Sequence, residues 1–219
     1  MPLSLRPLFA LFTGILVTCA PSFAFQSPLS DESVREAYFL GQRRDESMAA
    51  FLNKYTKFLP PPKSGPNIYS VSFLTPFALF VEYSSRQSDY SAQRAALDHK
   101  SQPEAVEISV EIVFTQSYGV FIATPTSSRS GSPIGTRLRS PDFWRTFKFR
   151  VFDGEEEIST DDLTGEPRYV CSEGGCTLSG ATVRLRFPAD AFYTETATIQ
   201  VVPPEGDPVS ADFDLASLR

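Results

Sequence analysis

The sequence predicts an α+β protein, mainly β, in which an N-terminal helical segment precedes an immunoglobulin-like antiparallel β-sandwich. Three observations lead to this class. Residues 30–59 repeat apolar side chains at helical spacing, whereas apolar and polar residues alternate in several segments after residue 67. Turn-forming glycine and proline residues separate these segments. Strict alternation buries one face of a strand and leaves the other in water, which is typical of antiparallel sheets.

The first 24 residues have the layout of a secretory signal peptide. Arg6 precedes an apolar run over residues 8–17, and Ser22-Phe23-Ala24 places small residues at both key positions of a cleavage site. The apolar run is shorter than the roughly 20 residues that a bilayer span needs. We therefore expect residues 1–24 to be cleaved and the protein to be periplasmic or extracellular. A lipid anchor at Cys19 is the less favoured alternative, because the threonine before it fits a lipoprotein signal poorly.

The expected mature chain has two parts. Residues 25–66 hold the helical segment and a proline-rich linker, and residues 67–219 hold the sandwich domain. Ser30 can cap a first helix, because its hydroxyl can accept from a free amide of the first turn. A second helix is predicted from Asp45, and Pro60-Pro61-Pro62 ends it. Its apolar residues share one face: Met48, Phe51, Leu52, Tyr55 and Leu59.

The strands are predicted from the alternation alone. Five segments alternate clearly: residues 106–115, 147–152, 181–187, 197–201 and 209–215. Asp153-Gly154 predicts a hairpin turn after the second of these segments. Two further strands are predicted at residues 68–74 and 77–83, and a short inserted helix is predicted near residues 88–100.

Cys171 and Cys176 remain as the only two cysteines once the signal peptide is removed. In an oxidising compartment such a pair predicts a disulfide. Closing so short a loop stabilises the fold by only about 2 kcal/mol, so we interpret the bond as a local pin on a turn. Two alternatives stay open. A thiol-redox pair usually has two residues between its cysteines, whereas four separate these, and a zinc site needs four ligands.

Composition argues against several classes of function. The chain has a net charge of −6, so it lacks the basic footprint that nucleic-acid binding needs. The single histidine, His99, follows an aspartate and precedes a lysine, so we expect an exposed residue without a catalytic role. We predict no catalytic residue, no cofactor, no transmembrane segment in the mature protein and a monomer.

Carboxylates gather around the predicted hairpin turn. Asp153, Glu155 and Glu157 could supply some of the six to eight oxygens that calcium takes, but their spacing differs from an EF-hand loop. We favour a solvated turn and predict no metal site, with calcium as the weak alternative. Paired carboxylates of a glycan hydrolase also stay an alternative, because sequence cannot place two acids relative to each other.

A long segment rich in Ser, Gly, Pro and Arg, residues 124–140, is the predicted contact region, because loops at the ends of a sandwich often bind partners. Together with nearby aromatic residues it defines a candidate binding surface of Tyr118, Phe121, Arg129, Arg137, Arg139 and Trp144. The predicted function is therefore a non-enzymatic interaction or binding module. Its expected partner is an unknown protein or an envelope glycan.

The two ends of the mature chain resemble a family of exported bacterial proteins of unknown function. The matching stretches are LSDESVREAYFLGQRR followed by FLNKYTKFLPPP, and the closing strands TATIQVVPPEGDPVSADFDLASLR. The resemblance implies a place in the bacterial cell envelope. It implies no catalytic or binding residue.

Overall fold

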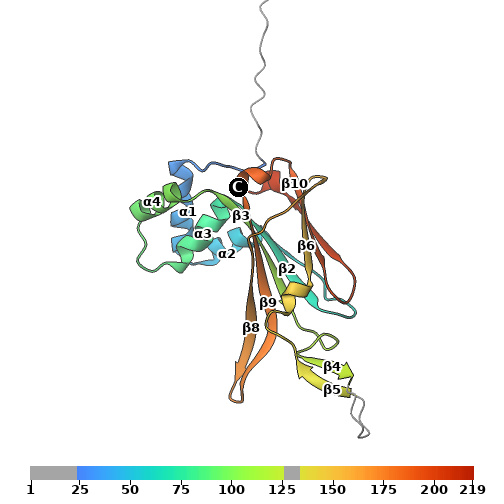
Figure 1. The fold of residues 1–219 in the computed structure, drawn as a ribbon. Helices are drawn as coiled ribbons and strands as arrows, with labels where there is room; N and C mark the ends of the chain where they lie inside the picture. The colour runs from blue at the N-terminus through green and yellow to red at the C-terminus, as the bar shows by residue number, and fades with distance from the viewer. Residues whose placement is uncertain (1–23, 126–133) are drawn as a thin grey trace, which may run out of the picture.

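The computed structural model describes residues 24–125 and 134–219, and it confirms the predicted class (Figure 1). Two antiparallel sheets face each other across one apolar core, and a layer of helices lies at one end of them. The helices are α1 (Asp31–Arg43), α2 (Glu46–Asn53), α3 (Pro76–Arg86) and α4 (Ala92–Ser101). In the described ranges, none of the helices has the length and apolar character needed to cross a membrane.

The first sheet has five strands in the order β1-β2-β3-β9-β8. These are β1 (Thr56–Phe58), β2 (Asn67–Leu74), β3 (Ala105–Val113), β9 (Gly175–Pro188) and β8 (Leu163–Ser172). The second sheet has the order β11-β10-β6-β7. Its strands are β11 (Val209–Asp214), β10 (Thr196–Val202), β6 (Lys148–Asp153) and β7 (Glu156–Ile158). A separate hairpin pairs β4 (Phe121–Pro125) with β5 (Ile134–Leu138).

The strand order is that of an immunoglobulin fold. The run β2-β3-β9-β8 reproduces the A-B-E-D sheet, and β11-β10-β6 reproduces the G-F-C sheet. Two insertions depart from this frame, because α3 and α4 lie between β2 and β3, and the β4–β5 hairpin lies between β3 and β6. The immunoglobulin-like prediction therefore holds, with a helical insertion longer than the sequence indicated.

Alternation produces the core as predicted. In β3, Val106, Ile108, Val110 and Ile112 are fully buried, and the residues between them are half-buried on the other face. The same pattern recurs in β9 and β10. Burial of these apolar side chains contributes about 1.5–3 kcal/mol each, which makes the space between the sheets the main source of stability.

Two local predictions in the N-terminal half are wrong. Residues 77–83 form helix α3 rather than a strand, because the Thr75 hydroxyl caps the amide of Ala78 and Pro76 occupies the first turn, where proline needs no donor. The second helix also ends earlier than predicted. After α2 the chain extends as β1, where the amide of Phe73 donates to the carbonyl of Tyr55 at 2.8 Å.

Close contact between α1 and α3 holds the helical layer together. Gly41 of α1 packs directly on the Val81 carbonyl and the Ser84 side chain of α3, so a methyl group has no room there. The apolar residues beside this contact form a small core of their own: Leu29, Val34, Ala37, Phe77 and Val81. A glycine in mid-helix weakens the helix itself, and here close packing explains its presence.

Replacing Gly41 with alanine should lower the free energy of unfolding by about 1–3 kcal/mol, because α1 must move away from α3. This loss should exceed the gain of about 1 kcal/mol that alanine brings to a helix. Urea denaturation measures the difference, and Gly119→Ala is a matched control because a methyl group there meets only ordinary contacts. Unchanged stability in Gly41→Ala would contradict the packing argument.

Candidate functional site

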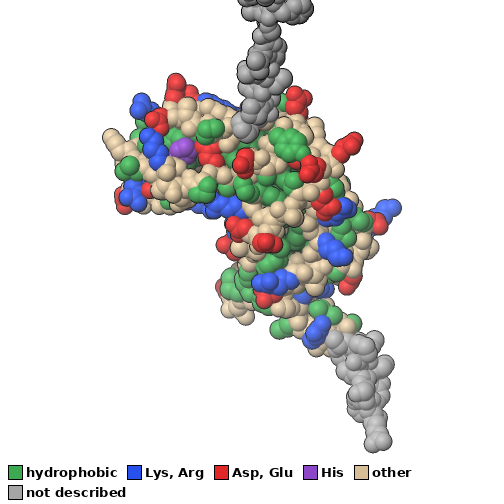
Figure 2. Space-filling view, turned by 45° about the horizontal axis from the view of Figure 1, so that its top comes forward, with side chains coloured by type: hydrophobic (Ala, Val, Ile, Leu, Met, Phe, Trp, Pro, Cys, Tyr) green, Lys and Arg blue, Asp and Glu red, His purple; other side chains and the backbone are tan. Residues whose placement is uncertain are grey.

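A cleft of about 310 Å³ lies where the helical layer meets the outer face of the first sheet. Helix α3 and the end of α4 form one side, and the outward-facing residues of β3 and β9 form the other. Figure 2 shows the molecule indented where the helical layer meets the sandwich, with acidic and basic side chains both gathered there. Leu29, Pro76, Leu79 and Phe80 make part of the wall apolar.

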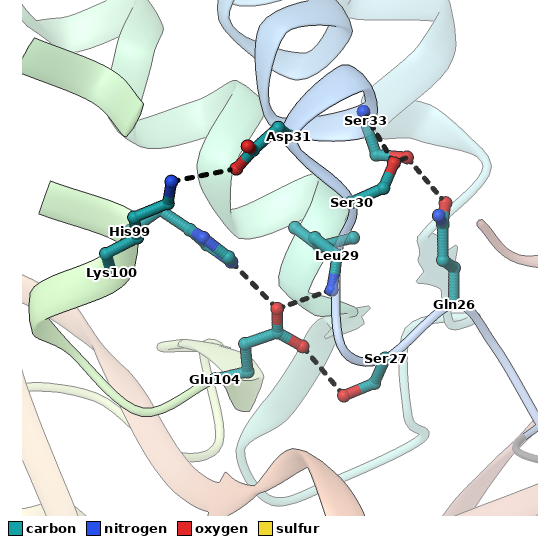
Figure 3. A network of polar contacts seen from close by, with 9 residues as sticks. All are labelled: Gln26, Ser27, Leu29, Ser30, Asp31, Ser33, His99, Lys100 and Glu104. Carbon is teal, nitrogen blue, oxygen red and sulfur yellow. Dashed lines mark hydrogen bonds and ion pairs between the residues drawn. The ribbon is translucent and has the colours of Figure 1, made fainter. Parts of the chain in front are cut away.

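The carboxylate of Glu104 lines the cleft and lies within a network of polar contacts (Figure 3). Its Oε1 accepts from the backbone amide of Leu29 at 2.6 Å and lies 2.8 Å from Nε2 of His99, and its Oε2 accepts from the Ser27 hydroxyl at 2.7 Å. Glu104 directly precedes β3. One side chain therefore ties the N-terminal segment and helix α4 to the start of a core strand.

His99 is not the exposed residue that the sequence predicts. Its side chain is only 16% exposed, and its ring lies edge-on to Phe80 at 6.2 Å between centroids. The prediction failed because the partner, Glu104, comes after the end of α4, where helical spacing gives no signal. The imidazole lines the cleft and contacts Glu104 there.

The side of the cleft formed by the sheet carries paired charges. Arg184 of β9 lies 3.4 Å from the Glu107 carboxylate and 2.9 Å from that of Glu166. On the helical side, Arg86 pairs with Glu82 one turn earlier in α3. Among the residues described, Arg186 has no such ion-pair partner. Most charges in the cleft are thus already matched by an opposite charge.

Glu107 is the acid most affected by its surroundings. Burial raises the pKa of its carboxyl, Arg184 opposes this effect, and the nearby Glu82 carboxylate adds to it. Glu166, on the exposed edge strand, behaves in the opposite way, because its hydrogen bond to Arg184 lowers its pKa. The cleft therefore holds one glutamate that resists ionisation.

The helical side of the cleft is partly aromatic. Phe80 and Tyr83 lie on α3 with ring centroids 6.5 Å apart, and Tyr90 extends the row at 5.5 Å from Tyr83. A second, smaller cavity of about 130 Å³ adjoins the cleft, since both are lined by Glu82, Glu107 and Arg184. This second cavity reaches strand β1 at Thr56, so the hollow continues across the outer face of the sheet.

The predicted contact surface is divided by the structure. Tyr118 and Trp144 are 1% and 3% exposed and belong to the main core, whereas Phe121 is 67% exposed. Arg139 packs its guanidinium over the Tyr118 ring, and its Nε donates to the Gly119 carbonyl at 2.9 Å. These four positions therefore do not share one exposed patch.

Arg137 is exposed on β5, where it pairs with Ile122, so its side chain lies on the opposite face of the hairpin from that of Phe121. Arg129 lies outside the described residues. A contact role remains a prediction for the exposed members of the set alone.

The acids of the hairpin turn support the fold instead of gathering around an ion. Asp153 is buried and accepts hydrogen bonds from the backbone amides of Tyr193 and Thr194, both at 3.1 Å. Glu157 pairs with Arg150 through two hydrogen bonds of 2.9 and 2.6 Å. Glu155 lies in the turn itself. Across residues 24–125 and 134–219, no three potential metal ligands come together, so the weak calcium alternative receives no support.

Cys171 and Cys176 form the predicted bond, with sulfur atoms 2.01 Å apart. They face each other across the β8–β9 hairpin, just before its turn, where Gly175 adopts a φ of +117° that suits glycine. Figure 1 shows this hairpin extending away from the helical layer. The disulfide is exposed and remote from the cleft, as a pin on a turn should be.

Comparison of the chain with protein-family models and with curated proteins gives no match. The resemblance to an exported family therefore stays a prediction. The function has to be inferred from the cleft itself.

Sequence reasoning did not find the cleft. Its acids and arginines sit on strands that are far apart in sequence, and only the pairing of β3 with β9 places Glu107 directly opposite Arg186. The alternating charges in these two strands indicate an outer sheet face. They do not indicate which strands lie next to each other.

Removing the disulfide should cost at most about 2 kcal/mol, because the closed loop is short. We expect a Cys171→Ser/Cys176→Ser variant to unfold at slightly lower urea concentration, with NMR shift changes confined to the β8–β9 hairpin. Changes spread over the cleft, or loss of the folded state, would show that the bond does more than pin the turn.

The pH dependence of two glutamine variants should have opposite signs. Glu107 has a raised pKa, so its ionisation weakens the fold as pH rises above the unfolded value, and Glu107→Gln should gain stability relative to the wild type between pH 4 and 7. Glu166 has a lowered pKa, so its ionisation stabilises the fold as pH rises toward the unfolded value, and Glu166→Gln should lose relative stability between about pH 2 and 5. Urea denaturation of the wild type and both variants at the two ends of each pH range measures the difference in stability. A relative stability that changes with pH in the same direction for both variants would contradict the prediction.

Proposed function

We propose that the protein is an exported, non-enzymatic binding module of the bacterial cell envelope, with its ligand in the cleft. The observation that carries the proposal is the cleft itself, about 310 Å³ in volume, in which the helices contribute apolar and aromatic residues beside charged ones and the sheet contributes charged residues. Ligand sites in proteins are usually concave surfaces that combine apolar walls with a few polar groups. Export is supported by the predicted signal peptide and by the exposed disulfide.

The arrangement of charges favours binding over catalysis. The carboxylates that line the cleft have partners: Glu104 contacts Ser27, Leu29 and His99, Glu82 pairs with Arg86, and Asp98 pairs with Arg94 at 2.9 Å. A general base must be oriented toward the proton that it takes from the substrate, whereas these side chains are oriented toward partners of their own. Groups held in this way position a ligand more readily than they exchange protons with it.

One observation favours a second candidate, a carboxylate-based glycan hydrolase. Glu82 on α3 and Glu107 on β3 line the same hollow, and the raised pKa of Glu107 is the property expected of a general acid. Release of reducing ends from a bound glycoside would favour this candidate over binding alone.

Filling the cleft should abolish binding without unfolding the protein. We expect fragments from a library of monosaccharides, amino acids and small carboxylates to shift NMR signals of cleft residues in the wild type. Ala105 lies in the cleft wall on the same face of β3 as Glu107, so Ala105→Phe should remove these shifts. Ala50→Phe, on the exposed side of α2, should keep them. Fragments that bind nowhere, or only elsewhere, would contradict the proposal.

A further inference from the structure

The cleft is one end of a longer polar groove. The adjoining cavity shares its central residues and continues over β3 and β2 to Thr56 of β1. Register places Thr56 opposite Ser72, Ser72 opposite Ser109, and Ser109 opposite Arg184. Residues directly opposite in antiparallel strands point to the same face. Four neighbouring strands therefore present three hydroxyl groups and a guanidinium in one row.

An exposed aromatic pair lies beyond the far end of this row. Phe58 is two residues after Thr56 on β1, so its side chain lies on the same face, and it is 60% exposed. Its ring meets Tyr69 edge-on, with centroids 5.5 Å apart. Phe80 and Tyr83 thus line the cleft, and Phe58 and Tyr69 form a second aromatic pair at β1, beyond the residues that line the adjoining cavity.

The charges of the groove favour a neutral ligand. Four carboxylates and three guanidinium groups line the cleft, and most are paired with one another or with near neighbours. Except at Arg186, a charged ligand would have to displace one of these partners or approach a group of its own sign. A ligand with hydroxyl groups can instead donate to the free carboxylate lone pairs and accept from the remaining N–H groups.

These features point to one ligand chemistry. A pyranose ring has an apolar C–H face that can stack on an aromatic ring, and hydroxyl groups around its edge that both donate and accept hydrogen bonds. From β9 to β1 the groove crosses three strand spacings, about 14 Å, which exceeds one sugar ring. Building on the proposed function, we propose that the module binds an extended chain of neutral sugars, which lies across the first sheet from the cleft to Phe58.

The length of the oligosaccharide is the decisive variable. The test titrates the wild-type protein with neutral linear chito-, cello- and malto-oligosaccharides of one to six units, using isothermal titration calorimetry. Affinity for at least one series should rise with length until the chain reaches Phe58. Phe58→Ala should then weaken binding of the longest member about tenfold, the effect of losing one aromatic contact, and leave binding of the shortest unchanged.

A matched control is Phe39→Ala, which removes a phenylalanine of similar exposure on α1 that lines neither cavity and should change neither affinity. Thermal unfolding of both variants shows whether each is folded. Equal affinity for short and long oligosaccharides, no effect of Phe58→Ala, or an effect of Phe39→Ala in its place would overturn the proposal.

The result also separates this inference from the proposed function. If none of the three series binds while other fragments still shift the cleft signals, the sugar chain is wrong and the binding module stands. If nothing shifts the cleft signals, both are wrong.

Discussion

Attachment of the helical layer to the sheet is the constraint on which the candidate site depends, and the Glu104 carboxylate supplies much of it. Its two oxygens contact the Ser27 hydroxyl, the Leu29 amide and His99. The backbone carbonyl of Glu104 accepts from the amide of Ala189 at 3.1 Å. Hydrogen bonds to an ionised group are about twice as strong as neutral ones. Because these partners come from separate segments, one partly buried carboxylate joins the N-terminal segment and helix α4 to the start of β3 beside the cleft.

The immunoglobulin frame explains why the cleft lies on an outer face. In a sandwich the inner faces are filled by the core, so a site must come from end loops, edges or an outer face. Here the A-B connection carries two helices, and α3 folds back over the outside of β2 and β3. The apolar residues Leu74 and Ala78, with the buried Tyr55, form the small core that joins this insertion to the sheet. The insertion turns an ordinary solvated sheet face into one side of a cleft.

Charge pairing across the outer face has a second consequence. Arg184 lies between Glu107 and Glu166, so the sheet has donors and acceptors at fixed positions without a large net charge. Such pairs add little to stability at a surface, where the gain is about 0–1 kcal/mol. Because these ion pairs add so little stability and lie beside aromatic rings, their position fits the proposed binding role better than a stabilising one. The raised pKa of Glu107 fits this account, because a half-buried acid is tolerated where a ligand can approach it.

The sequence by itself determined the fold class, the five regular alternating strands, the inserted helix near residues 88–100 and the pairing of Cys171 with Cys176, because each follows from local spacing. Tertiary structure decided the rest. Residues 77–83 were predicted as a strand, but the Thr75 cap and packing against α1 make them part of helix α3. Tyr118 and Trp144 were predicted to lie on a binding surface, but both are buried in the core of the sandwich. The cleft required strand order, since a sequence shows which residues face outward but not which strands become neighbours.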